Sequence, residues 1–223
     1  TAFMFVGALV WVSYLISGKL TGGRVHGSAI AIGLGLVLAW WGGQATGGSR
    51  GLSDIPLFAG VGVMGGAMFR DFAIVATAFG ADVRALKGAG AVGALSIVIG
   101  VLLSFVIGAV VAVSFGYTDP IAVTTIGAGA ATYIVGPVTG TALGASSEII
   151  ALSVAAGLTK SVLVMIGTPF VASRIGLNNP HSALIYGGLM GTTSGVAGGL
   201  AATDPKLVPY GAMTATFYTG AGC

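Results

Sequence analysis

Two segments rich in glycine and hydroxyl groups interrupt the apolar tracts of this sequence. TTIGAGAATYIVG begins at Thr124, and TTSGVAGGLAATD begins at Thr192. Each is long enough to unwind a helix, which would leave backbone carbonyls and amides without helical partners. Free carbonyls and hydroxyls are suitable ligands for a sodium ion, whereas free amides at the start of a half-helix attract an anion. Together the segments predict a site for a cation and an anion.

The expected binding residues are the hydroxyl and glycine positions of these segments, with one lysine between them. For the substrate they are Thr124, Thr125, Gly127, Lys160, Thr192, Thr193, Ser194 and Gly195. Sodium is expected near Thr125, Gly136, Thr193 and Gly195. Gly136 is included because it precedes Pro137, and this pair breaks a helix and leaves carbonyls unpaired. The structural alternative is that the hydroxyls bond back to helical carbonyls and that the glycines only pack.

Charged residues inside the apolar tracts are the next candidates. Lys160 lies near the middle of tract 148–173. A charge at that depth is costly and indicates a function by default, here the pairing with an anionic substrate. A structural pairing, or extension of the side chain to the interface, is the alternative. Arg70 and Asp71 are adjacent and would not face each other on a helix, so they either line the site or mark the cytoplasmic end of tract 54–79.

The last apolar tract carries a polar stripe. Tyr210, Thr214 and Tyr218 recur every four residues, so on a helix they share one face, which is expected to turn toward the protein. Enzyme motifs are missing from the sequence. GTTSG around Ser194 has one residue too many for a nucleophile elbow, and His, Cys and Asp do not cluster as metal ligands. The sequence therefore favours binding or transport over catalysis, with sodium as a coupling ion and no other cofactor.

The composition places these residues in a membrane protein. Hydrophobic residues make up 55% of the 223 and charged residues 7%, against about 25% charged residues in a soluble domain. So few charges cannot cover a surface in water. The apolar tracts run to about 20 residues without alternation, which indicates helices rather than a barrel. The net charge of +3 is dispersed and does not suggest nucleic acid.

Eight apolar tracts follow one another with short connectors. They lie near 1–17, 25–41, 54–79, 88–115, 120–146, 148–173, 181–203 and 207–223. No connector resembles an interdomain linker, so one transmembrane transport domain is expected over residues 1–223. The two segments rich in threonine and glycine lie within tracts 120–146 and 181–203.

The basic residues of the connectors predict the orientation, because Lys and Arg gather on the cytoplasmic side. If 120–146 and 181–203 are re-entrant hairpins, the N-terminus lies outside. Six basic residues then lie on the cytoplasmic side, and one lies on the outer side. These are Lys19, Arg24, Arg84, Lys87, Arg174 and Lys206 inside, and Arg50 outside. The expected fold is an all-α integral membrane protein with about six transmembrane helices and two broken hairpins that enter from opposite sides. Such inverted repeats bind substrate and ion at the tips near the midplane, as in secondary transporters that work by alternating access.

Four long strings resemble the MadM subunit of bacterial sodium–malonate symporters. They are GGRVHGSAIAIGLGLVLAWWGG, DIPLFAGVGVMGGAMFRDFAIVATAFG, TTIGAGAATYIVGPVTG and GGLMGTTSGVAGGLAATDPKLVPYGAMTATFYTG. The resemblance covers nearly the whole chain. It implies sodium-coupled import of malonate by a two-subunit carrier of the bacterial inner membrane, with the smaller membrane protein MadL as partner. Small-residue faces such as Gly62–Gly66 are expected to provide the contact.

A more distant likeness leaves a second function open. GLNNPHSALIYGGLMGTTSGVAGG is similar to a stretch of LrgB-type proteins, which also pair with a small membrane partner. LrgB-like chains carry a histidine where this chain has Ser194 and Gly195. The alternative function is therefore a holin-like pore or a regulator of murein hydrolases. A carrier accumulates its substrate against a gradient at the expense of an ion gradient, whereas a pore does not.

Overall fold

The structure, a computed structural model, describes the chain except for residue 24, residues 49–50, residues 66–82 and residue 223. The described residues form helices and turns and contain no strand. Four stretches are long and apolar enough to cross a membrane, namely Ala2–Leu20, Gly27–Gly62, Gly90–Ser114 and Ser147–Val171. The expectation of an all-helical chain with long apolar helices is confirmed. The chain forms two compact units, Thr1–Gly80 and Ala81–Cys223, and the single transport domain stays a prediction.

The N-terminal unit is built on two long helices. Its elements are α1 (Ala2–Leu20), α2 (Gly27–Thr46), the 3₁₀ turns η1 (Gly51–Asp54) and η2 (Pro56–Phe58), and α3 (Ala59–Gly65). Ser17 Oγ donates to the Val25 carbonyl at 2.6 Å and so closes the turn between α1 and α2. His26 caps α2, because its Nδ1 accepts from the Ser28 backbone N–H. Partial burial lowers the pKa of His26, which favours the neutral ring that this acceptor role requires.

Tract 54–79 does not begin as one continuous helix. Pro56 opens the separate turn η2, and α3 begins only at Ala59. Gly62 of the expected packing face lies in α3. Gly66 and the Arg70–Asp71 pair lie outside the described residues, as do two of the basic residues used for the orientation, Arg24 and Arg50.

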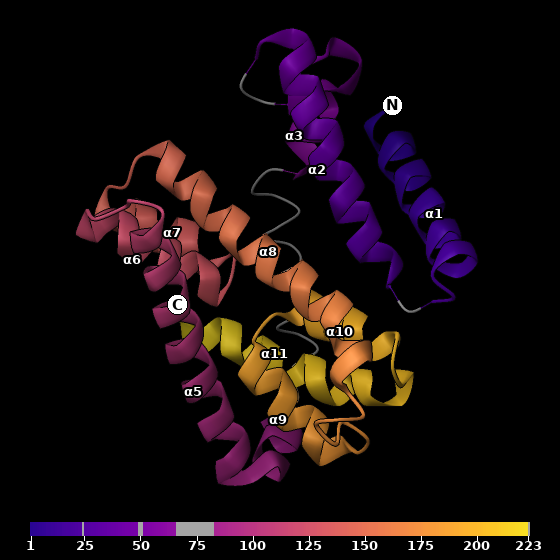
Figure 1. The fold of residues 1–223 in the computed structure, drawn as a ribbon, viewed down its shortest axis with the longest axis vertical. Coiled ribbons are helices and arrows are strands. Elements are labelled where there is room, and N and C mark those ends of the chain that lie inside the picture. Colours follow the sequence, from indigo (N-terminus) through magenta and orange to yellow (C-terminus); the bar gives the residue numbers. More distant parts are fainter. Residues whose placement is uncertain (24, 49–50, 66–82, 223) are drawn as a thin grey trace. The chain divides into compact units, whose positions relative to one another are not determined.

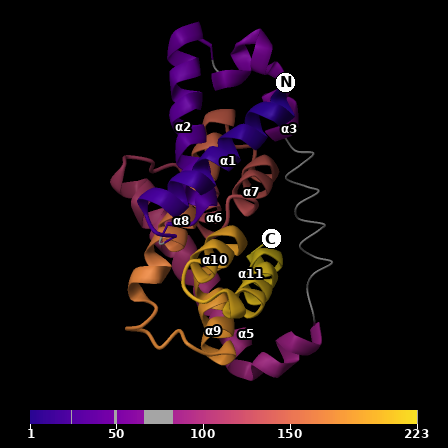
Figure 2. The same cartoon turned by 90° about the vertical axis from the view of Figure 1, so that its right-hand side faces the viewer.

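The C-terminal unit combines two long helices with several short ones (Figures 1 and 2). Its elements are α5 (Val83–Ser114), α6 (Pro120–Ala131), α7 (Val135–Leu143), α8 (Ser147–Val171), α9 (Pro180–Met190), α10 (Thr193–Ala201), η3 (Pro205–Leu207) and α11 (Val208–Gly222). Gly90 has φ 65° and ψ −165°, which separates a short first helix of α5 from its apolar part. α11 has 15 residues. At 1.5 Å per residue it is about 22 Å long, which is shorter than the roughly 30 Å of a full span.

Tract 120–146 folds back on itself as expected. α6 and α7 are antiparallel, because a Cβ at Gly136 would meet Gly129, and a Cβ at Gly140 would meet the Thr125 side chain. These glycines let the two backbones approach closely. Both helices also pack on α8, where a Cβ at Gly129 would overlap the Ser153 backbone. The first hairpin is therefore the pair α6 and α7.

Tract 181–203 forms a second, more open hairpin. α10 runs along α8 in the same direction, with Gly195 against Ser161 and Gly199 against Thr168. α9 follows α8 after a short connector, and the hydroxyls of Tyr186 and Thr168 are 2.7 Å apart. α9 and α10 have few contacts with each other, and both pack on α11. The second hairpin is therefore the pair α9 and α10, with α11 between its limbs.

The two hairpins point in opposite directions along α5. α6 follows α5 after a short turn and packs back along it. α9 packs on α5 through its C-terminal end, with Gly188 against Ser96 and Gly100, and it runs in the direction of α5 (Figure 1). Figure 1 shows α6 and α7 beside one end of α5 and α9 beside the other. Hairpins that follow α5 in opposite senses bring their tips toward the same level.

Both hairpins begin with the same motif, which is GYTDP at 116–120 and GLNNP at 176–180. The glycine of each motif has a positive φ, 90° and 67°, in the turn that follows the preceding long helix. Asp119 then accepts from the Ala122 N–H, and Asn179 accepts from the Ser182 N–H. The proline takes the first helical position. The same start motif therefore precedes α6 and α9.

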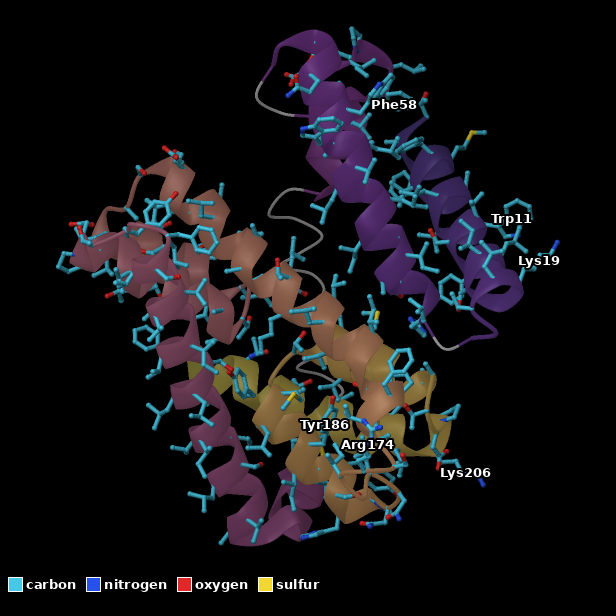
Figure 3. The ribbon with its side chains drawn as sticks, in the orientation of Figure 1. Trp11, Lys19, Phe58, Arg174, Tyr186 and Lys206 are labelled. Carbon is cyan, nitrogen blue, oxygen red and sulfur yellow. The ribbon has the colours of Figure 1, made fainter. Side chains whose placement is uncertain are left out.

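The connectors on either side of the second hairpin lie at the same end of the unit. Leu177 precedes α9, Leu207 follows α10, and both are buried in one apolar cluster with Ala183. Their exposed basic neighbours, Arg174 and Lys206, are labelled at this end in Figure 3. The cytoplasmic position of both side chains stays a prediction.

Candidate functional site

The tip of the first hairpin lies later in the chain than the sequence predicted. Thr124 and Thr125 are inside α6, which continues to Ala131. Thr132 is extended, with φ −153° and ψ 145°, and its Oγ1 accepts from the Ile134 N–H at 3.1 Å. The expectation that the first threonine pair forms the tip is therefore wrong. The pair follows a well-capped helix start, whereas the β-branched Thr132 favours extended backbone.

The second tip lies where the sequence predicted it. α9 ends at Gly191, and α10 begins after Thr192. Thr192 Oγ1 caps α10 by accepting from the Gly195 N–H at 3.3 Å. Thr192 is buried, whereas Thr193 and Ser194 are half-buried. The hydroxyls of Thr193 and Ser194 have no hydrogen-bond partner within the part of the chain that the structure describes.

Both tips contact α8 at its middle. Gly157 faces the first tip, because a Cβ there would overlap the Tyr133 backbone N and the Gly129 carbonyl. One turn later, the Ser161 and Thr192 hydroxyls share a hydrogen bond of 2.5 Å. α8 has 25 residues, so these contacts lie near its midpoint. Two tips that arrive from opposite directions thus converge on one turn of α8.

Lys160 lies between these contacts, and its ammonium group joins three other helices. Nζ donates to the Ala131 carbonyl at 2.8 Å, to Ser104 Oγ at 2.9 Å and to Tyr218 Oη at 3.2 Å. An ammonium group has three donors, so all are used. Ala131 ends α6, where the helix dipole presents a partial negative charge. Among the described residues no carboxylate forms an ion pair with Lys160.

Tyr218 connects Lys160 to the second tip. Its side chain is fully buried, and its ring lies against Gly191, where a Cβ would overlap it. Lys160 Nζ is also 4.8 Å from the centroid of this ring, within the range of a cation–π interaction. Of the expected polar stripe, Thr214 and Tyr218 face the protein, whereas Tyr210 is exposed.

The other predicted residues lie away from this convergence. Thr125 is fully buried, and its Oγ1 has no hydrogen-bond partner among the residues that the structure describes. Gly127 lets α6 approach Phe105 of α5, and Gly136 packs against Gly129. The residues expected around sodium are therefore divided between the two hairpins, and their joint role stays a prediction.

Residues that the sequence analysis missed supply much of the site. Ser104 and Ser161 are serines inside apolar helices, and Thr132 lies at the first tip. Their partners lie on distant helices, so no local pattern indicates them. One signal was available for Thr132. When the motifs at 116–120 and 176–180 are aligned, Thr132 corresponds to Thr192, the cap of the second tip.

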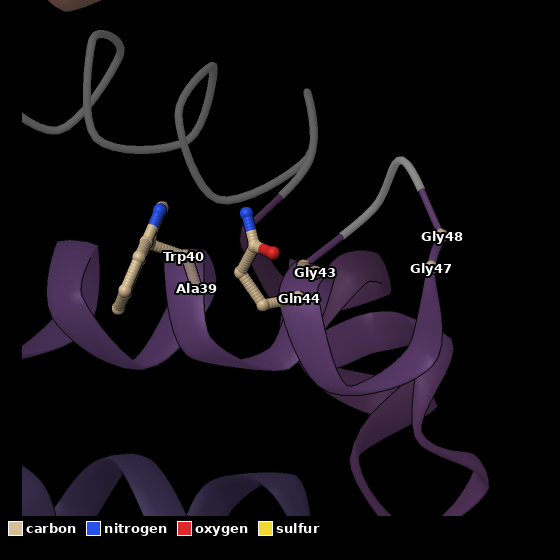
Figure 4. A pocket seen from close by; sticks show the side chains of 7 residues that line it. Ala39, Trp40, Gly43, Gln44, Gly47 and Gly48 are labelled. Carbon is tan, nitrogen blue, oxygen red and sulfur yellow. The ribbon is translucent and has the colours of Figure 1, made fainter.

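A hollow of about 420 Å³ lies elsewhere, in the N-terminal unit (Figure 4). Its lining residues are Ala39, Trp40, Gly43, Gln44, Gly47, Gly48 and Gly51. None of these described lining residues carries a charge. The convergence at Lys160 is the better candidate, because it combines a cation, free hydroxyls and helix ends at mid-span.

Comparison with protein families identifies the chain over its full length. The model of the malonate/sodium symporter MadM subunit matches residues 1–223. Neither the curated proteins nor the solved structures provide a match. The match spans both units of the structure.

Proposed function

This chain belongs to the malonate/sodium symporter MadM subunit family, and from that premise we propose that malonate and sodium bind where the hairpin tips meet α8. The family function is sodium-coupled malonate transport across a membrane, so the chain is a transporter subunit and not an enzyme. The family therefore favours the carrier over the holin-like pore. The observation that carries the placement is Lys160, a mid-span cation linked to both tips and without a carboxylate partner among the described residues.

The second tip supplies the groups that an anion requires. α10 begins at Thr193, and the first N–H groups of a helix have no helical partner and lie at the positive end of its dipole. The half-buried hydroxyls of Thr193 and Ser194 are available as further donors. Lys160 is adjacent to Ser161, which bonds to this tip. One carboxylate of malonate binds Lys160, and the other binds the start of α10.

The first tip supplies the oxygens that a sodium ion requires. The last carbonyls of α6 lie at the negative end of its dipole. Sodium at this tip and a carboxylate at the other lie on the same turn of α8. Each charge lowers the cost of burying the other, because electrostatic interactions are strong where water is excluded. This attraction couples the ion to the substrate.

In the membrane, the two hairpins are re-entrant and enter from opposite faces. Support comes from their opposite directions along α5, from the repeated start motif and from the shared position of Arg174 and Lys206. The chain spans the bacterial inner membrane several times with its N-terminus outside. Alternating access follows when one bundle moves against another around the tips.

The transporter works with a small membrane partner of the MadL type. The family description calls the chain a subunit, which implies at least one further component. The exposed apolar side chains of α5, such as Leu102, Ile107 and Val110, offer a surface to lipid or to this partner. A small-residue face at Gly62 remains a second candidate contact.

Uptake of labelled malonate by the two-subunit complex in proteoliposomes tests the site. Under an inward sodium gradient, Lys160→Met is expected to raise the KM for malonate at least tenfold, because a lost charge-assisted hydrogen bond costs about 1.5–3 kcal/mol. Thr193→Val is expected to raise it severalfold. Thr159→Val is the matched control, since the Thr159 hydroxyl is exposed and only bonds back to Ala155. An unchanged KM in both site variants contradicts the placement.

A further inference from the structure

The three oxygens around Lys160 form a cation site that a side chain of the protein occupies. We propose that Lys160 holds the sodium site in the absence of malonate, and that sodium replaces its ammonium group when a malonate carboxylate draws the lysine away. This inference rests on the proposed function, because it takes Lys160 as the partner of malonate. It adds three sodium ligands, which are the Ala131 carbonyl, Ser104 Oγ and Tyr218 Oη.

The ligands have the chemistry that sodium prefers. One is a backbone carbonyl at the end of a half-helix and two are hydroxyls, and they surround Nζ at 2.8, 2.9 and 3.2 Å. An ammonium group and a sodium ion carry the same charge, and unwound carbonyls of half-helices coordinate sodium in other transporters. A set of oxygens arranged for one such cation is therefore suited to the other.

The surrounding helices hold these oxygens in place whether or not Lys160 is present. Tyr218 Oη donates its proton to the Gly100 carbonyl at 3.0 Å, so its lone pairs remain free for a cation. The Tyr218 ring is wedged against Gly191, and Gly100 packs closely on the Gly188 carbonyl. Ser104 and Gly100 belong to α5 one turn apart. The three oxygens thus come from α5, α6 and α11, and none of them belongs to α8.

Competition for these oxygens explains why ion and substrate bind together. Sodium cannot enter while the Lys160 ammonium is present, because two like charges would share three oxygens. Malonate gives Lys160 another partner and so vacates the site. Malonate alone would leave the buried end of α6 without its cation, which is costly for unpaired polar groups. Each ligand therefore binds well only when the other is bound, and each tightens the other by the same factor.

Sodium binding without malonate tests the replacement directly. The purified two-subunit complex in choline buffer is titrated with sodium at constant ionic strength, and thermal stabilisation gives the half-maximal concentration. Wild type is expected to bind sodium at least tenfold more tightly when malonate is added. Lys160→Met is expected to bind sodium without malonate at least tenfold more tightly than wild type, and malonate is expected to have no further effect.

Second substitutions locate the ligands. In the Lys160→Met background, Ser104→Ala and Tyr218→Phe are each expected to reverse the gain in sodium affinity severalfold, whereas Thr159→Val leaves it unchanged. If Lys160→Met is poorly folded, Lys160→Gln keeps hydrogen-bond donors at neutral charge and is expected to show the same gain. If the gain in sodium affinity remains in both Ser104→Ala and Tyr218→Phe, these side chains are not sodium ligands and the assignment is wrong.

The two proposals fail in different ways. An unchanged sodium affinity in Lys160→Met and Lys160→Gln without malonate overturns the replacement by sodium, whatever the transport assay shows. An unchanged malonate KM in Lys160→Met contradicts the proposed function. The arm of the sodium titration without malonate does not depend on malonate binding, and the Ser104→Ala and Tyr218→Phe substitutions assign its signal to the oxygens around Lys160.

Discussion

Thr125 is a buried hydroxyl without a partner, in contrast to the other buried hydroxyls of the C-terminal unit. Thr168 bonds to the Val164 carbonyl and to Tyr186, and Thr214 bonds to the Leu184 carbonyl. Thr125 Oγ1 makes no such bond. A buried hydroxyl without a hydrogen bond lowers the free energy of unfolding, because on burial it lost its hydrogen bonds to water and gained none in the protein.

Thr125→Val removes this hydroxyl at nearly constant volume. We expect the free energy of unfolding to rise by about 1 kcal/mol or more, since the desolvation cost disappears. Melting of the complex in sodium-free buffer measures the change. Thr168→Val is the control. We expect it to lower the free energy of unfolding, because the Tyr186 hydroxyl loses its hydrogen-bond partner.

A loss of stability in sodium-free buffer would contradict this expectation and show that a group of the protein bonds to the hydroxyl. When sodium is present, the ion is the partner that the sequence predicted for Thr125. A sodium dependence of transport that weakens in Thr125→Val would therefore support a sodium ligand at Thr125, away from Lys160.

Among the elements, α8 bears the contacts on which the site depends. Gly157 admits the first tip, and Ser161 binds the second. Gly157→Ala would place a Cβ inside the backbone of the first tip, which cannot move as a flexible side chain does. We expect weaker sodium activation of transport and a lower melting temperature, with a cost typical of overpacking, about 1–3 kcal/mol.

Gly167→Ala is the matched control on the same helix. A Cβ at Gly167 meets nothing within 4 Å, and alanine favours a helix over glycine by up to about 1 kcal/mol. We expect equal or higher stability and normal sodium activation in this variant. If Gly157→Ala also behaves in this way, the first tip does not rest on α8.

The sequence predicted elements better than contacts. Long apolar tracts and cap residues act locally, so both hairpins and the second tip could be placed. The first tip was misplaced because Thr124 and Thr125 resemble Thr192 and Thr193, although only the latter pair follows a helix-ending glycine, Gly191. Lys160 was found from its depth alone. Its partners could not be found, because they come from three helices that only the fold brings together.

For the whole molecule, the repeated motif before each hairpin gives the C-terminal unit its symmetry. Each motif places a glycine in the turn after a long helix and starts a hairpin with Asx-Pro. α8 runs antiparallel to α5 (Figure 1). The same motif after each helix therefore directs the second hairpin opposite to the first. Two copies of one motif thus produce tips that meet near the middle of α8, where the proposed binding site lies.

This symmetry predicts which residues face which side of the membrane. In a chain with Cys223 replaced by serine, single cysteines at Thr118 and Ser147 lie at the two ends of the first hairpin, and Asn178 lies before the second. All three positions are exposed. We expect a membrane-impermeant thiol reagent to label the first two from outside and Asn178 from the cytoplasm. Labelling of Ser147 from the cytoplasm would mean that residues 120–146 cross the membrane, and opposed re-entrant tips would be excluded.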